Sequence, residues 1–225
     1  ILVGGYLTVT VGSGVVGTET QSLSGIEIIR LNGQGQIYLR QGDQESLRIE
    51  AEDNILPLIE TRVAGDRLIL EFKKGFFRTV FPRKGIKYFI TVADPREVTI
   101  SGSGSIEATD ISSPRFRVQV NGSADAYLEN MVADELVSDI NGSGKFFVSG
   151  EVFEQRVEIS GSGDYRARDL ASNIASVRIS GSGDVELSVQ DELDVRISGS
   201  GKVLYHGTPR ISQRISGSGK IVNGN

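Results

Sequence analysis

One pentapeptide, Ile-Ser-Gly-Ser-Gly or a close variant, recurs seven times from residue 100 onwards and constrains the fold more than any other feature. Successive copies are 18 to 20 residues apart. A fixed period of this kind is typical of repeat proteins, in which each unit stacks on its neighbours. A degenerate eighth copy lies at residues 31–35. The first glycines of the seven copies are Gly102, Gly122, Gly142, Gly161, Gly181, Gly199 and Gly217.

Apolar and polar residues alternate on both sides of the motif. Val177-Arg-Ile179 precedes one copy, and Val185-Glu-Leu187 follows it. Alternation with a period of two and β-branched residues on one side predicts strands. One unit is therefore a strand, a Gly-Ser-Gly corner, a second strand and a variable return such as residues 188–194. Glycine suits the corner because a positive φ carries no Cβ penalty there.

The length of the unit selects among the repeat folds. A propeller blade needs about 40 residues, and a unit of 18–20 residues is also too short to include the crossover helix of a parallel sheet. One coil of a β-helix fits, with successive coils about 4.8 Å apart. We predict an all-β, single-stranded parallel β-helix with coils of 18–20 residues, in which the seven glycines form one column. The residues expected to point inward beside them are Ile100, Val120, Ile140, Ile159, Ile179, Ile197 and Ile215.

The chain divides into three stretches. Residues 1–18 are rich in apolar residues and interrupted by glycine, and are either the remnant of a secretion leader or a first strand. Residues 19–98 hold strand-like segments and are expected to be divergent β coils, some of which could pair as antiparallel hairpins. Residues 99–225 form the regular seven-repeat β-helix. Residues 19–225 should be one continuous domain.

Stacked coils align equivalent residues into outward columns. Opposite charges in such columns are typical of a solvated surface that keeps strands in register. Asp164 and Asp184 would be neighbours and could hold a cation or act as acid and base, but such sites gather three or more carboxylates. The first column is Ser105, Asp125, Lys145, Asp164, Asp184, Lys202 and Lys220. The second is Thr99, Gln119, Asp139, Glu158, Arg178, Arg196 and Arg214.

Composition limits the chemistry further. The chain has no Cys and a single His, and its net charge is −5. Thiolate metal sites and cysteine nucleophiles are therefore excluded. His206 lies in a turn with no obvious acid partner in the sequence. We predict no catalytic residues, no cofactor and no metal site.

Residues 73–89 differ from the rest of the chain. They hold six basic residues, five aromatic residues and no acid, so the remainder carries −11. Interleaved basic and aromatic residues suit anionic glycans, lipid headgroups or nucleic acid, and the acidic remainder argues against nucleic acid. The alternative is a cap in which Phe76, Phe77 and Phe81 fold over the solenoid. The residues predicted to bind at this surface are Lys73, Lys74, Phe76, Phe77, Arg78, Phe81, Arg83, Lys84 and Lys87.

The repeats, together with Tyr205-His-Gly-Thr-Pro209 and the front segments Ser24-Gly25-Ile26 and Gln41-Gly42-Asp43, resemble the bacterial "putative auto-transporter adhesin, head GIN domain" family. The resemblance covers roughly residues 15–225. It implies a right-handed β-helix of pectate-lyase-like shape behind a secretion or lipoprotein signal. It carries no catalytic residues with it.

We therefore expect a non-enzymatic, extracytoplasmic surface or adhesion-type module, located at the cell surface, in the periplasm or outside the cell. It should bind a cell-surface polymer or a protein, associate peripherally with the envelope, and not bind nucleic acid. One alternative is a carbohydrate-active β-helix lyase or hydrolase, which needs a deep groove with clustered Asp, Glu or Arg that the repeats do not display. Another is a structural or envelope-stress sensing domain. Self-association is expected through the C-terminal coil, residues 211–222, because an open coil exposes backbone donors and acceptors.

Overall fold

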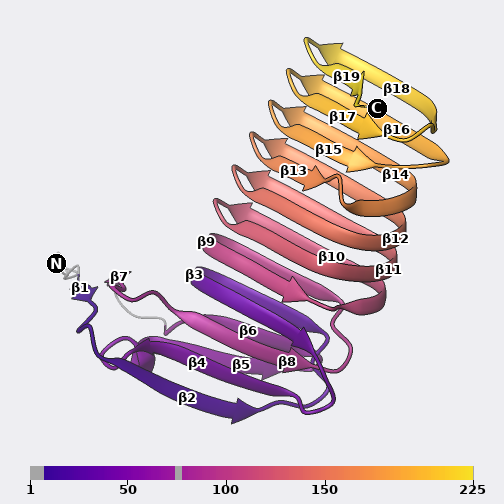
Figure 1. The fold of residues 1–225 in the computed structure, drawn as a ribbon. Helices are drawn as coiled ribbons and strands as arrows, with labels where there is room; N and C mark the ends of the chain where they lie inside the picture. Colours follow the sequence, from indigo (N-terminus) through magenta and orange to yellow (C-terminus); the bar gives the residue numbers. More distant parts are fainter. Residues whose placement is uncertain (1–7, 74–77, 225) are drawn as a thin grey trace.

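A stack of parallel strands makes up most of the molecule (Figure 1). The computed structural model describes residues 8–73 and 78–224. Each coil of the stack pairs in register with the next, so the chain is a parallel β-solenoid, as predicted. The strands of the stack are β9 (Glu97–Thr109), β10 (Ser112–Gly122), β11 (Asp125–Gly142), β12 (Lys145–Gly161), β13 (Asp164–Ala167), β14 (Leu170–Gly181), β15 (Asp184–Ser188), β16 (Glu192–Gly199), β17 (Lys202–His206), β18 (Arg210–Gly217) and β19 (Lys220–Asn223).

The first glycines of the motif lie side by side in one column, which confirms the predicted register. Gly142 pairs with Gly122 in the coil before it and with Gly161 in the coil after it. Its φ is 138°, and a Cβ added there would lie 2.1 Å from the carbonyl oxygen of Gly122. Both the backbone conformation and the close approach of the next coil therefore require glycine at this corner.

The core runs along the axis of the stack. The inward residues beside the glycine column are almost fully buried from Ile100 to Ile197, as predicted. Ile215 differs, because it is 38% exposed. It lies in β18, which pairs with β16 along one edge and with no other described strand.

One cluster of polar side chains interrupts this apolar core. The Gln155 amide, which is fully buried, donates to Ser172 Oγ at 2.7 Å and to the carbonyl oxygen of Ser188 at 3.0 Å. The Tyr165 hydroxyl donates to Gln155 Oε1 at 3.2 Å, and burial raises the pKa of this phenol. The cluster joins three successive coils through hydrogen bonds that satisfy each buried group.

The strands before residue 98 are more varied than the predicted β coils. The degenerate motif copy lies in β3 (Ile28–Gln41), which pairs with β9 in parallel and in register. The other strands form a mixed sheet across the same end of the stack (Figure 1). They are β2 (Val16–Ser22), β4 (Ser46–Glu52), β5 (Ile59–Ala64), β6 (Arg67–Phe72) and β8 (Lys87–Val92), with a short 3₁₀ turn at Leu56–Leu58.

Antiparallel pairing in this mixed sheet corrects the expectation of coils throughout and confirms the hairpin alternative. β5 and β6 form a hairpin, and β4 pairs antiparallel with both β2 and β8. The hairpin turn has two residues, Gly65 and Asp66, and Gly65 has a φ of 65°. So short a connection reverses the chain and leaves no residues for a coil.

The described part of residues 1–18 contains strands. β1 (Thr8–Val11) pairs in parallel with β7 (Arg78–Phe81), and β2 begins at Val16. Residues 1–7 of this stretch lie outside the described residues, so the leader interpretation stays a prediction. None of the described residues belongs to a helix with the length and hydrophobicity that a membrane span requires.

Candidate binding faces

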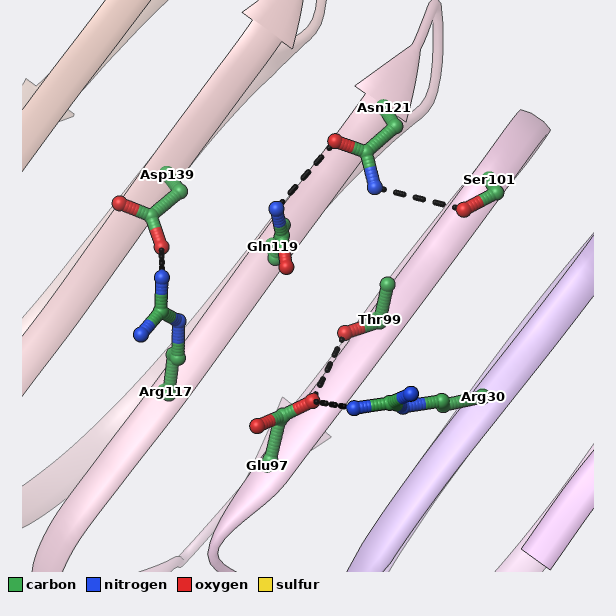
Figure 2. Close-up of polar contacts among 8 residues, drawn as sticks. All are labelled: Arg30, Glu97, Thr99, Ser101, Arg117, Gln119, Asn121 and Asp139. Carbon is green, nitrogen blue, oxygen red and sulfur yellow. Dashed lines mark hydrogen bonds and ion pairs between the residues drawn. The ribbon is translucent and has the colours of Figure 1, made fainter.

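Polar side chains form ladders on the face that precedes the glycine corner (Figure 2). Arg30 and Glu97 form an ion pair at 3.2 Å, and the Thr99 hydroxyl donates to the same carboxylate at 3.2 Å. The Asn121 amide donates to the Ser101 hydroxyl of the preceding coil at 3.3 Å. Thr99 belongs to the second column predicted from the sequence, and the register confirms that column from Thr99 to Arg214.

A groove of about 520 Å³ follows this face over the middle coils. The expectation that the repeats display no cluster of Asp, Glu and Arg is therefore wrong. A single column of the repeat does not contain the cluster, because the groove lies across several neighbouring columns. We call this feature the charged groove. Its charged lining residues are Arg115, Arg117, Arg156, Arg178, Arg196, Asp139, Glu154, Glu158, Glu192 and Asp194.

Most carboxylates of the charged groove are engaged by arginines. Asp139 lies 2.5 Å from the Arg117 guanidinium, and Glu154 lies 2.8 Å from that of Arg156. Burial raises the pKa of the Asp139 carboxyl, and this outweighs the opposing effect of Arg117. The neighbouring carboxylates of Glu158 and Glu97 raise that pKa further. Four of the five groove carboxylates are therefore paired with an arginine, and Glu158 alone has no ion-pair partner among the described residues.

Three arginines stack at the basic end of the second column. Arg178 pairs in register with Arg196, and Arg196 pairs with Arg214. Only Arg196 has a partner among the described residues, since its guanidinium lies 3.2 Å from Asp194. Adjacent parallel strands lie about 4.8 Å apart, so these exposed positive charges repeat at that spacing along the face. We call these three residues the arginine ladder.

The first predicted column is also present. Asp164 and Asp184 are direct neighbours in register, with Lys145 before them and Lys202 after them. The Arg166 guanidinium lies 3.8 Å from the Asp164 carboxylate. Within residues 8–73 and 78–224 no group of three or more His, Cys, Asp or Glu could hold a metal ion.

His206 has an acid partner that the sequence analysis missed. Its Nε2 lies 3.0 Å from Glu186 Oε1, and the side chain is half-buried at the end of β17. Glu186 precedes His206 by 20 residues, about one coil. The spacing was visible in the sequence, but the contact is diagonal between columns and does not follow from the register alone.

The predicted basic and aromatic surface is described only in part. Lys74, Phe76 and Phe77 lie outside the described residues, as does the side chain of Arg78. Phe81 is 55% exposed, and Lys73, Arg83 and Lys84 are exposed, while Lys87 is half-buried in β8. Binding by this surface stays a prediction, and so does the self-association expected through the C-terminal coil.

Two aromatic pairs lie on the face that follows the glycine corner. Tyr38 and Phe89 stack with ring centroids 4.8 Å apart, and Tyr127 and Phe147 stack at 5.1 Å. Tyr127 and Phe147 are 39% and 40% exposed. The sequence analysis did not identify these pairs, although Tyr127 and Phe147 are separated by one repeat period.

The stacked coils, with charged ladders on one face and stacked aromatic pairs on another, define the class of protein as a parallel β-solenoid. Residues 27–209 match the family model described as "Putative auto-transporter adhesin, head GIN domain". The chain belongs to this family.

Solved bacterial structures share the fold. A "putative adhesin" from Bacteroides fragilis has a TM-score of 0.88 and 22% identity, covering 95% of this chain and 99% of that one. A "putative adhesin" from Parabacteroides distasonis has a TM-score of 0.72 and 22% identity, covering 96% and 99%. A "putative lipid binding protein" from the same species has a TM-score of 0.74 and 26% identity, covering 97% and 100%. No curated protein sequence matches the chain.

Proposed function

We propose that this chain is a non-enzymatic adhesion-type module that works outside the cytoplasm and binds an acidic polymer of the cell surface through the charged groove. The observation that carries the proposal is the arginine ladder, in which Arg178 and Arg196 line the charged groove and Arg214 continues the column at the next coil. Arg178 and Arg214 have exposed guanidinium groups with no ion-pair partner among the described residues. Guanidinium groups bind carboxylates and phosphates through two parallel hydrogen bonds.

The rigid repeat explains why the ligand should be a polymer. Guanidinium groups about 4.8 Å apart present the same interaction at successive coils, so a chain with regularly spaced anions gains several contacts at once. Each contact is exposed and weak by itself. Repetition along the solenoid axis compensates for this weakness.

The family and its relatives support an adhesion-type role at the surface or outside the cell. The family description names an auto-transporter adhesin, and two of the similar structures carry the name adhesin. The third carries the name of a lipid binding protein, and the phosphate of an anionic lipid headgroup would bind guanidinium groups as the anions of an acidic polymer do.

One observation favours the alternative of a polysaccharide lyase or hydrolase, namely the clustering of Asp, Glu and Arg in the charged groove. Against it, the carboxylates of Asp139, Glu154 and Asp194 each lie within 3.2 Å of an arginine. A general acid and base need carboxyl groups that can exchange protons with the substrate. In these ion pairs the carboxylates face arginines rather than an open position for a substrate.

Binding to immobilised alginate, a polyuronate, tests the proposal, with neutral dextran as the reference polymer. We expect retention on alginate that weakens as salt is raised, and a loss of at least tenfold in the triple variant Arg178→Gln, Arg196→Gln, Arg214→Gln. The matched control removes three exposed arginines elsewhere, in Arg40→Gln, Arg62→Gln, Arg168→Gln. If both triple variants lost binding equally, the binding would depend only on the net charge of the protein. The charged groove would then not be the binding site.

A second assay addresses the enzyme alternative. Prolonged incubation with alginate and with neutral glycans should release no new reducing ends. If reducing ends are released and the Glu158→Gln variant releases none, the protein is an enzyme and the proposal of a non-enzymatic binding module is wrong.

A further inference from the structure

A column of outward side chains on the face after the corner has an ordered sequence of charge and aromatic character. The backbone register places Arg48, Phe89, Tyr38, Glu107, Tyr127, Phe147 and Arg166 side by side in this order. Each tyrosine is backed by a phenylalanine, with interplanar angles of 11° and 4°. The two aromatic pairs therefore face each other across a single residue, Glu107.

The space above Glu107 has the dimensions of a small binding site. Neighbouring strands are about 4.8 Å apart, so the Tyr38 and Tyr127 positions are separated by roughly 9.6 Å with Glu107 midway. Two hollows meet at this point, and both are lined by Glu107 and Thr109. One has a volume of about 390 Å³ and includes Tyr38. The other has a volume of about 220 Å³ and includes Tyr127 and Glu129. We call this space the tyrosine slot.

Glu107 and Glu129 line the smaller hollow of the tyrosine slot without any basic residue and favour a cation there, whereas Arg40 and Arg48 line the larger hollow. The face of an aromatic ring is electrically negative, so a carboxylate between two rings adds negative charge to a negative environment. No described residue forms a side-chain hydrogen bond or an ion pair with the Glu107 carboxylate. Burial raises the pKa of the Tyr38 hydroxyl, and the charges of Glu107 and Glu50 raise it further, which is consistent with a negative potential there.

The same column already contains one cation that lies over an aromatic ring. At its end, the Arg48 guanidinium carbon lies 3.8 Å from the centroid of the Phe89 ring. The outer face of that aromatic pair is therefore already covered by a positive charge. The inner face, toward Glu107, has no such group.

We propose that the tyrosine slot binds an organic ammonium group, with its nitrogen between the rings of Tyr38 and Tyr127 and above the Glu107 carboxylate. A cation at the midpoint would lie about 4.8 Å from each ring, inside the roughly 6 Å reach of a cation–π interaction. An alkylated ammonium suits the slot better than a metal ion, because calcium takes six to eight oxygen ligands. The slot lies on a different face from the charged groove, and the inference does not depend on the proposed function.

Titration with choline, followed by amide chemical shifts of the full chain, tests the proposal. We expect saturable shifts around Tyr38, Glu107 and Tyr127, and none with 3,3-dimethylbutan-1-ol, in which carbon replaces the charged nitrogen. Glu107→Gln keeps the shape of the side chain and should weaken choline binding at least tenfold. Tyr127→Leu should do the same, while Glu151→Gln, exposed on another face, should leave binding unchanged.

A second arm identifies the source of the ammonium group. Retention of the protein on phosphatidylcholine vesicles, reversed by free choline and lost in Glu107→Gln, would assign a lipid headgroup. Choline binding without vesicle retention would assign a soluble ammonium compound. The proposal is overturned if choline causes no saturable shifts, if the neutral analogue binds equally well, or if Glu107→Gln has no effect in a protein whose thermal unfolding is unchanged.

Discussion

The carboxylate of Glu52 accepts a hydrogen bond from the backbone N–H of Arg83 at 2.9 Å, and the two residues are 31 positions apart. Its other oxygen accepts from the N–H of Gly14 at 3.0 Å. Glu52 is fully buried at the end of β4. One side chain therefore holds the loop between β1 and β2 close to the loop between β7 and β8.

Replacing Glu52 by glutamine should loosen both loops. A glutamine has one acceptor oxygen and one donor amide, so one of the two backbone N–H groups would face another donor. We expect a loss of about 2 to 3 kcal/mol in the free energy of unfolding and faster hydrogen exchange at Gly14 and Arg83. Glu60→Gln, on β5, is the control and should change stability by less than about 0.5 kcal/mol. Unchanged exchange at both amides would show that the carboxylate does not hold them.

Alanine at a column glycine should destabilise the solenoid far more than alanine at a turn glycine. In Gly142→Ala the new Cβ meets the carbonyl oxygen of Gly122, and the residue keeps a φ of 138°. We expect a loss of more than about 3 kcal/mol. Gly65→Ala also has a positive φ but open space around it, so it should lose only about 1 to 2 kcal/mol. Urea unfolding of the two variants, compared with the parent chain, measures the difference. Similar losses would contradict the importance of coil-to-coil contact.

Asp139→Asn should increase stability at neutral pH. The pKa of this carboxyl is raised in the folded chain, chiefly by burial. The native state therefore favours the protonated form, and its stability falls as the pH rises through the raised pKa. Asparagine stays neutral and still offers Arg117 an acceptor oxygen. The gain over the parent chain should shrink as the pH is lowered and vanish well below the ordinary carboxyl pKa of 3.8. If the stability gained by Asp139→Asn instead increased as the pH was lowered, the predicted direction of the pH dependence would be wrong.

Self-association through the C-terminal coil can be tested by measuring the oligomeric state of the chain and of two variants. Ile211, Ile215 and Val222 are each 38% exposed on β18 and β19. Each of these strands pairs with another described strand along one edge only. Light scattering at rising concentration should show a dimer that Ile221→Lys disrupts and Ser216→Lys, on the outer surface, does not. A monomer at every concentration would contradict the expectation.

The part of the fold that repeats could be predicted from the sequence, because a fixed period determines which residues become neighbours. Gly142 faces Gly122 and Gly161 for no reason other than spacing, and the charged columns follow by the same rule. The mixed sheet could not be predicted in this way. Its strands have no common period, and the pairing of β4 with β8 depends on turn geometry and on contacts distant in sequence, such as that of Glu52 with Arg83.

The candidate sites also differ in whether the repeat period of the sequence predicts them. The arginine ladder lies within one column and was visible in the sequence. The charged groove needed the lateral packing of several columns. The tyrosine slot combines both cases, since Tyr127 follows from the period while Phe89 reaches the column from the irregular part of the chain.

The buried Gln155 cluster has a consequence for how the chain finds its correct structure. Nearly identical coils can pair out of order, with one coil looped out and the next taking its place, at little loss of backbone hydrogen bonding. Gln155 binds groups that lie 17 and 33 residues further along the chain. If a coil were omitted, the Gln155 amide would lose these acceptors and stay unpaired in an apolar interior, which costs about 1 to 3 kcal/mol. A single polar cluster thereby distinguishes the one correct order of coils from the slipped orders that their similarity would otherwise permit.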